Sequence, residues 1–210
     1  MLTTRDIKLI PCGLYRENAY LVCPEGRDDC ALIDPGDDLA LLRHMLDACG
    51  RRLAAILLTH GHFDHLLAAG PLAEQTGAEI YLHADDEALL KDPERMAYDP
   101  EAAVLPPPEA LSTKRFGRDI EVCGETFTVL ETPGHTMGSV CLHAPESRVL
   151  FSGDTLFQAG YGRTDLYGGD EGQMALSLLM LLTTLPEETV VFPGHGSPTT
   201  IGAERKRYRL

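Results

Sequence analysis

The chain has 210 residues, and its 44% hydrophobic and 24% charged residues are typical of a soluble globular protein with a sizeable core. Its formal net charge of -14 argues against nucleic acid as a partner, because binding to a phosphate backbone needs a basic surface. An anionic small substrate is compatible with this charge, since a metal site sets its own local field. The length predicts a single domain, at residues 1-210.

The six cysteines are scattered along the sequence and form no Cys-x-x-Cys motif. We expect them to be reduced core residues of a cytoplasmic protein, because several lie in apolar runs and the chain does not begin with a signal sequence. No segment is long and apolar enough to span a bilayer, so no membrane partner is expected. A disulfide framework is not expected in a chain of this size without a signal peptide. The cysteines are Cys12, Cys23, Cys30, Cys49, Cys123 and Cys141.

Predicted strands and helices alternate in the first half of the chain. The expected strands lie at 7–10, 19–23, 30–33, 53–58 and 80–82. The expected helices lie at 37–49, 66–77 and 85–91. Asp37 or Asp38 would cap the first helix and Gly50 would follow its end. Residues 11–13 are interpreted as a turn after the first strand, and Gly70 with the proline after it should interrupt the second helix.

The second half begins after an acidic, proline-rich segment at 92–113, which we predict to be a surface loop. The expected strands lie at 120–123, 126–130, 139–143, 149–151 and 189–192. Helices are expected at 173–185 and, in the basic tail, at 202–210. Two strand-rich parts with helices outside predict an α/β (α+β) fold of two packed sheets, a four-layer αββα sandwich.

Residues 59–65 carry an unusual density of ligand side chains. Three imidazoles and one carboxylate lie within six residues, directly after the apolar run at 54–58. Imidazole and carboxylate are ligands of zinc, and a hydrolytic zinc site keeps one position open for water. The four side chains are those of His60, His62, Asp64 and His65.

Three later apolar runs also end in a candidate ligand that follows a glycine, and these ligands are His135, Asp154 and His195. Glycine permits the sharp turn that aims the next side chain across a sheet edge. The alternative interpretation is that the candidate ligands are ordinary polar residues whose hydrogen bonds are satisfied within the fold. The repeated pattern argues against it. His44, His83 and His143 fit no ligand position and are interpreted as ordinary helix or strand residues.

The spacing divides the seven candidates between two divalent ions, zinc first, with iron or manganese as alternatives. His60 and His62 point the same way in extended backbone, so we place them on the first ion with His135. The second ion takes Asp64, His65 and His195, and Asp154 would bridge the two. A bridging hydroxide would attack an acyl carbonyl, with Asp64 as the catalytic carboxylate that orients it. The sequence has no Gly-x-Ser-x-Gly motif, and no serine or cysteine nucleophile is required.

With its HxHxDH motif at residues 60–65 and the later ligands in order, the chain resembles the metallo-β-lactamase superfamily. That resemblance implies the fold, and it implies that Asp34, in the stretch 32–36, supports a ligand histidine. The stretches 162–166, 168–170 and 192–196 look most like those of short glyoxalase II-like hydrolases, which implies a thioester substrate such as S-lactoylglutathione. Because the sequence ends at Leu210, we expect the chain to lack the C-terminal helical domain that helps glyoxalase II to bind glutathione.

Two other interpretations stay open. Persulfide dioxygenases share a stretch similar to residues 162–165 and use one iron, but they tend to have larger residues where this chain has Gly36 and Gly194. A metal site kept only for structure is the non-enzymatic alternative.

Substrate contacts and partners are less specified by the sequence. Tyr161 and Arg163 could contact the substrate. The sequence is equally compatible with a packing role for Tyr161 and with a structural ion pair between Arg163 and Asp165. The expected partner is a small acyl or thioester molecule, and the chain would be a monomer or a homodimer.

Overall fold

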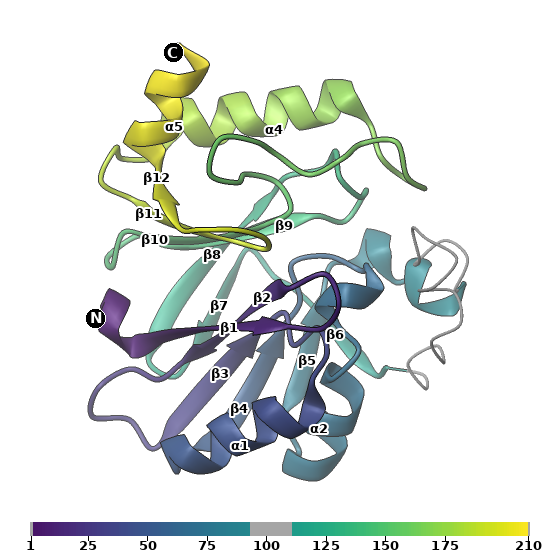
Figure 1. Ribbon diagram of the computed structural model, residues 1–210, viewed down its shortest axis with the longest axis vertical. Helices are drawn as coiled ribbons and strands as arrows, with labels where there is room; N and C mark the ends of the chain where they lie inside the picture. Colours follow the sequence, from purple (N-terminus) through teal and green to yellow (C-terminus); the bar gives the residue numbers. More distant parts are fainter. Residues whose placement is uncertain (1, 93–110, 210) are drawn as a thin grey trace.

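Two six-stranded sheets pack face to face in the computed structural model, which describes residues 2–92 and 111–209 (Figure 1). The first sheet contains, in spatial order, β1 (Ile7–Cys12), β2 (Glu17–Val22), β3 (Asp29–Ile33), β4 (Arg52–Leu57), β5 (Glu79–Leu82) and β6 (Thr113–Arg115). The second contains β12 (Thr199–Thr200), β11 (Val190–Pro193), β10 (Val149–Gly153), β9 (Val140–Ala144), β8 (Glu125–Glu131) and β7 (Asp119–Val122).

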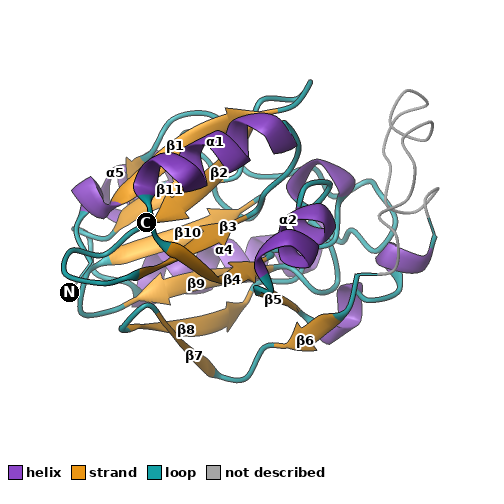
Figure 2. Ribbon diagram, turned by 90° about the horizontal axis from the view of Figure 1, so that it is seen from below, coloured by secondary structure: helices purple, strands orange, loops and turns teal. Residues whose placement is uncertain are grey.

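Helices cover the outer face of each sheet. The helices α1 (Leu39–Cys49) and α2 (Ala69–Thr76) lie across the first sheet, as Figure 2 shows from below. The helices α4 (Glu171–Thr184) and α5 (Ile201–Tyr208) cover the second sheet (Figure 1). Short 3-10 turns complete the described elements: η1 (Thr4–Asp6), η2 (Phe63–His65), η3 (Ala84–Asp86) and η4 (Leu89–Lys91). The predicted four-layer αββα sandwich is confirmed.

The core lies in three layers of apolar side chains. The layer between the sheets includes Tyr20 and Leu57 from the first sheet and Phe127, Phe151 and Phe192 from the second. A second layer joins α1 and α2 to the first sheet, and a third joins α4 and α5 to the second sheet. Each sheet is therefore covered on both faces, which explains why its central strands are apolar at nearly every position.

Strand direction brings several strand ends to one edge of the sandwich. The strand β9 is antiparallel to both β8 and β10, while β10 and β11 are parallel. The carboxyl ends of β8, β10 and β11 therefore share one edge. In the first sheet β3, β4 and β5 are parallel to one another, with α1 and α2 as their crossover connections.

Several predicted elements differ from the structure. The strand β1 continues through residues 11–12, where a turn was expected, because β1 is an edge strand and tolerates Pro11. The second helix is not interrupted at Gly70; α2 begins at Ala69, and Pro71 occupies its first turn, where a proline costs no hydrogen bond. The expected helix at 85–91 is the two turns η3 and η4 instead.

Two short strands were not predicted. They are β6 and β12, which have three and two residues and therefore offer almost no periodicity. The strand β6 begins at Thr113, at the end of the expected surface loop. The rest of that loop prediction, at 93–110, lies outside the described residues.

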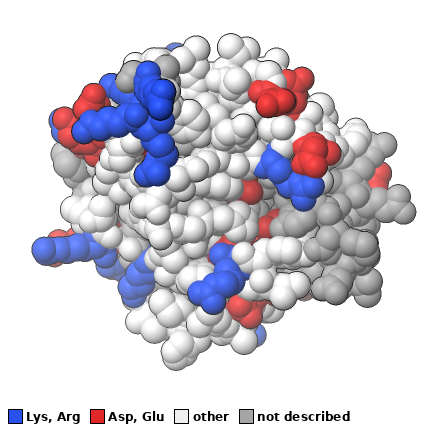
Figure 3. Space-filling model, turned by 45° about the horizontal axis from the view of Figure 1, so that its top comes forward, with Lys and Arg blue, Asp and Glu red and all other residues white. Residues whose placement is uncertain are grey.

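Basic side chains gather where α5 approaches the C-terminus, on the face seen in Figure 3. Arg205 donates hydrogen bonds from its guanidinium group to the carbonyls of Leu182 and Leu185, and it contacts Glu187 at 3.1 Å. Carbonyls at a helix end lack intrahelical partners, so Arg205 caps the end of α4.

None of the helices in the described part of the chain has the length and apolar character to cross a membrane.

Candidate metal centre

The seven side chains predicted as ligands meet at the edge where β4, β8, β10 and β11 end. The ligand atoms of His60, His62 and His135 all lie within 4.8 Å of one another. The ligand atoms of Asp64, His65 and His195 form a second such group. Asp154 forms a further group with His60 and His65.

Asp154 faces both groups of ligands. Its Oδ1 lies 3.4 Å from Nε2 of His65, and its Oδ2 lies 3.6 Å from Nε2 of His135 and 3.7 Å from Nε2 of His195. Asp64 lies with the second group, with Oδ2 at 3.4 Å from Nε2 of His195 and 3.8 Å from that of His65. A carboxylate between two clusters of imidazoles can give one oxygen to each of two ions.

Three of the histidines are held by their Nδ1 atoms. Nδ1 of His135 lies 2.7 Å from the carbonyl oxygen of Arg163, which can only accept, so this nitrogen carries the proton. Nδ1 of His65 lies 3.1 Å from Oδ2 of Asp34, with the same consequence. Each arrangement turns Nε2 toward the centre, which is the orientation that a metal ligand requires.

His60 is held in the same way through Thr59. The Thr59 hydroxyl donates its proton to Asp34 at 2.6 Å, so it accepts from Nδ1 of His60 at 3.1 Å. The opposite nitrogen, Nε2 of His60, is buried and has no hydrogen-bond partner within residues 2–92 and 111–209. A buried imidazole nitrogen without a hydrogen bond costs free energy, and a metal ion would satisfy it.

Burial sets the protonation of these ligands. It lowers the pKa of His60 well below its ordinary value, and with the charge of His135 it lowers the pKa of His62 to about 3. Burial opposes ionisation of Asp64 and Asp154, but His65 and its neighbours hold both carboxyl pKa values low. Neutral imidazoles and ionised carboxylates are the forms that bind metal. Against the effect of burial, the carboxylates of Asp64 and Asp154 raise the pKa of His65 well above its ordinary value, so His65 would release a proton when it binds an ion. The residues present therefore fit a pair of divalent ions of the zinc, iron or manganese class.

Asp34 lies where the sequence places a supporting residue. It accepts hydrogen bonds from the backbone N–H of Thr59 at 2.7 Å and from the Thr59 hydroxyl, besides its contact with His65. Glu17, which was not predicted, lies fully buried with Oε1 3.8 Å from Nδ1 of His65. Burial and the nearby carboxylates raise the pKa of Glu17 well above its ordinary value, so it is a neutral acid beside the histidine.

The turn that carries His195 is fixed by β2, from the other sheet. The backbone N–H of Asn18 donates to the carbonyl of Gly194 at 2.7 Å, and the Asn18 amide donates to the carbonyls of Pro193 and Gly196 at 3.0 and 2.9 Å. The Tyr20 hydroxyl also donates to Pro193, at 2.6 Å. The only sequence signal for this role is a run of polar side chains inside an apolar strand.

Asp86 is a further supporting residue that the sequence did not reveal. Its Oδ2 accepts from the backbone N–H of Gly61 at 2.8 Å and from the Thr136 hydroxyl at 2.7 Å, and its Oδ1 accepts from the N–H of Gly138 at 2.7 Å. It therefore ties the histidine-rich segment of the first sheet to the segment that carries His135.

The two predicted substrate contacts lie on the segment beside the centre. The intervening Gly162 donates its N–H to the carbonyl of Asp154 at 2.9 Å. Tyr161 is 44% exposed, so its ring is accessible from solvent. The Arg163 side chain is exposed and forms an ion pair with Asp165 at 2.7 Å, which is the alternative to a substrate contact that the sequence left open. The backbone carbonyl of Arg163 accepts from Nδ1 of His135.

Comparison with known proteins gives one family for nearly the whole chain. A model of the "Metallo-beta-lactamase superfamily" matches residues 12–195. The chain is 33% identical to "Hydroxyacylglutathione hydrolase GloC" of Haemophilus influenzae, over 96% of this chain and 95% of that protein.

Two solved structures are similar over nearly their full length. BLEG-1, titled a B3 metallo-beta-lactamase, is 35% identical with a TM-score of 0.86, and 95% of this chain and 96% of that chain align. TTHA1623, solved in a di-iron-bound form, is 40% identical with a TM-score of 0.84, and 95% of this chain and 97% of that chain align.

Proposed function

The chain belongs to the metallo-beta-lactamase superfamily, and from this premise we propose that it is a metal-dependent hydrolase of small-molecule thioesters. One observation carries the hydrolase proposal: two groups of imidazole and carboxylate ligands lie on either side of Asp154. The proposed ligands of the first ion are His60, His62 and His135, those of the second are Asp64, His65 and His195, and Asp154 would bridge. Two bound divalent ions would supply hydroxide at neutral pH and polarise the acyl carbonyl.

The side chains of the chain itself have separate proposed roles. The carboxylate of Asp64 stays ionised, because His65 and His195 lower its pKa, so it can accept a hydrogen bond from a water molecule and orient it. The low pKa of Asp154 keeps its carboxylate charged between the two imidazole groups. Asp34 and the carbonyl of Arg163 hold the ring planes of His65 and His135.

The thioester substrate is supported by the likeness to a hydroxyacylglutathione hydrolase and by the loop stretches at 162–166 and 192–196. Tyr161 is exposed beside the proposed centre and is the candidate to contact the acyl group. Arg163 is already paired with Asp165, so its guanidinium would have to leave this partner to bind an anionic substrate.

A persulfide dioxygenase is the second candidate, because of the Gly-Arg-Thr-Asp stretch at 162–165. Gly36 and Gly194 argue against it. A Cβ on Gly36 would stand 1.8 Å from the carbonyl oxygen of Asp64, so this chain has no room for the larger residue that such enzymes tend to carry there. Iron remains a candidate metal on the donor set, which suits iron and zinc alike.

The test is a substrate panel on protein whose metal content has been measured. Zinc-loaded and iron-loaded protein would be assayed on S-lactoylglutathione, simpler thioesters, carboxyl esters, lactones and a β-lactam. We expect thioesters to have the highest kcat/KM, and Asp64→Asn to abolish turnover while Asp85→Asn, at an exposed position, retains it. Full metal occupancy without hydrolysis of any substrate would sink the hydrolase proposal. Iron-dependent oxygen uptake with glutathione persulfide would favour the dioxygenase.

A further inference from the structure

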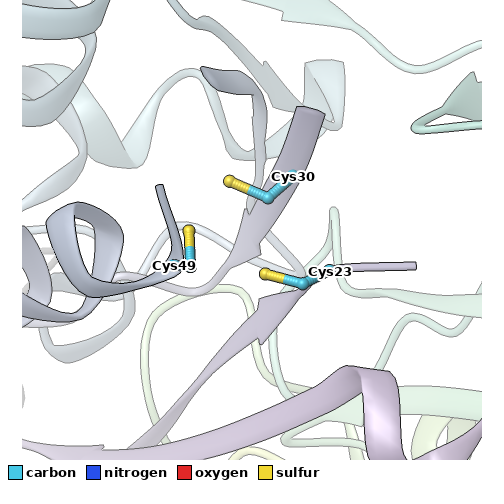
Figure 4. Close-up of side chains that lie close together, drawn as sticks. All are labelled: Cys23, Cys30 and Cys49. Carbon is cyan, nitrogen blue, oxygen red and sulfur yellow. The ribbon is translucent and has the colours of Figure 1, made fainter. Parts of the chain in front are cut away.

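Three cysteines that are distant in sequence converge at the end of the first sheet away from the histidines. Cys23 directly follows β2, Cys30 lies in β3, and Cys49 is the last residue of α1 (Figure 4). Their sulfur atoms all lie within 4.8 Å of one another, and none of the three forms a disulfide.

This cluster is separate from the histidine centre. The strand β2 begins at Glu17, beside His65, and ends just before Cys23; β3 contains Cys30 at its start and leads to Asp34 beside His65. About five residues of extended strand, on the order of 17 Å, thus separate the two groups.

The spacing of the sulfur atoms suits one thiophilic ion. Metal–sulfur bonds of about 2.3 Å place two sulfurs on the same ion about 3.8–4.0 Å apart. A movement of less than about 1 Å would therefore seat all three thiolates around one ion. Cys49 is half-buried at the end of a helix, while Cys23 and Cys30 are buried.

A pocket of about 370 Å³ gives access to the cluster and supplies charge. Cys23 and Cys49 line it, together with the basic residues Arg5, Lys8 and Arg51. Asp6 and Glu25 also line it, so basic groups outnumber acidic ones by one. A divalent ion with three thiolates carries one net negative charge, which this basic surplus would offset.

Among the clustered thiols, Cys23 is the one whose pKa is lowered. A hydrogen bond from the Cys30 thiol, with further help from Cys49, Arg51 and Lys8, lowers the pKa of Cys23 to about 6 against the effect of burial, while the same contact and burial raise the pKa of Cys30. The Cys49 thiol also lies 3.0 Å from the carbonyl oxygen of Leu46, and the Cys30 thiol lies 3.7 Å from that of Arg52, so each proton has a carbonyl as a second acceptor. Binding would release these protons and replace both weak contacts by metal–sulfur bonds.

We propose that Cys23, Cys30 and Cys49 form a second metal site, which takes one thiophilic ion such as Zn²⁺ or Cd²⁺ through three thiolate sulfurs. The pocket side of the ion stays open to solvent or to a further ligand. The site does not depend on the hydrolase proposal, because no residue of the histidine centre contributes to it.

The test is a titration of the reduced, zinc-loaded protein with Cd²⁺, followed by near-ultraviolet absorption. We expect a thiolate-to-metal charge-transfer band that saturates at one equivalent. The histidine centre cannot produce this band, since it has no sulfur ligand. The band should be lost in Cys49→Ser and retained in Cys12→Ser, a matched change at a buried thiol outside the cluster. Cys49→Ser should leave any hydrolytic turnover unchanged.

Several results would overturn the site. They are the absence of the band in the reduced unsubstituted protein, a band of equal size in Cys49→Ser, and a Cys23–Cys30 disulfide in place of metal uptake. X-ray absorption at the cadmium edge covers the case in which a variant fails to fold, because it uses the unsubstituted chain. Three sulfur neighbours support the proposal, whereas nitrogen and oxygen neighbours alone refute it.

Discussion

Gly194 lies so close to Asp154 that a Cβ atom on residue 194 would stand 2.3 Å from Oδ1 of Asp154. The same atom would stand 2.7 Å from Cε1 of His65. Only glycine lets the backbone directly after β11 pass this close to the carboxylate between the two ligand groups. The glycine before His195 is therefore required by the centre itself and not only by the turn.

Gly194→Ala should consequently displace Asp154 or His65 and disrupt both ligand groups. We expect the variant to lose at least one of the two proposed ions, measured as metal content per chain after dialysis. Gly160→Ala is the control, because a Cβ on Gly160 meets nothing within 4 Å. Unchanged metal content in Gly194→Ala would show that Asp154 does not hold the ions.

Asp34→Asn should weaken metal binding without removing a ligand. The charge that accepts from Nδ1 of His65 is lost, and such supporting contacts typically contribute about 10- to 100-fold in metal affinity. Asparagine tolerates the left-handed backbone of this position, where φ is +47°, so strain is avoided. Asp38→Asn is a matched control at φ +53° on the surface. Competition with a chromophoric chelator measures both affinities, and equal values would contradict the role of Asp34.

Asp86→Ala should be strongly destabilising. It removes the acceptor of two buried backbone N–H groups, those of Gly61 and Gly138, and of the Thr136 hydroxyl. We expect a loss of about 3 kcal/mol or more in the free energy of unfolding, measured in urea. The neighbouring Asp85→Ala removes an exposed carboxylate and should change that free energy by about 0.5 kcal/mol or less. Similar losses for both variants would contradict this assignment.

His143 should make the protein less stable in acid. Burial lowers its pKa below 6.5, and its Nε2 has no hydrogen-bond partner among the described residues. The unfolded chain therefore binds the proton more tightly, so stability is lost as the pH falls below about 6.5. In His143→Phe, the difference between the free energies of unfolding at about pH 7.5 and about pH 5 should be smaller than in the unsubstituted protein.

Leu142→Ala is the control for this pH dependence. It removes a buried apolar side chain from the position of β9 just before His143, so it should lower the free energy of unfolding equally at both pH values. A pH dependence of His143→Phe that equals that of the unsubstituted protein would assign the acid sensitivity to other groups.

The sequence by itself determined the sandwich and the candidate ligands. The signals used were local, because they follow from the backbone geometry of a few neighbouring residues. They are apolar runs of strand length, apolar residues at the helical period of 3.6, and glycines before polar residues. They predicted the αββα layers, which are confirmed, and they singled out residues 60–65 with His135, Asp154 and His195. The structure brings these side chains to one edge; their binding of metal stays a prediction.

Apart from Asp34, only the tertiary structure decided which residues support that edge. Asn18 holds the turn at Pro193, 175 positions away, and Asp86 joins Gly61 to Gly138. The three sulfur atoms of Cys23, Cys30 and Cys49 likewise meet through β2, β3 and α1, although their spacing matches no motif. Such contacts depend on which strands pair and on how the sheets pack, and periodicity in one segment contains no information about its partner in another.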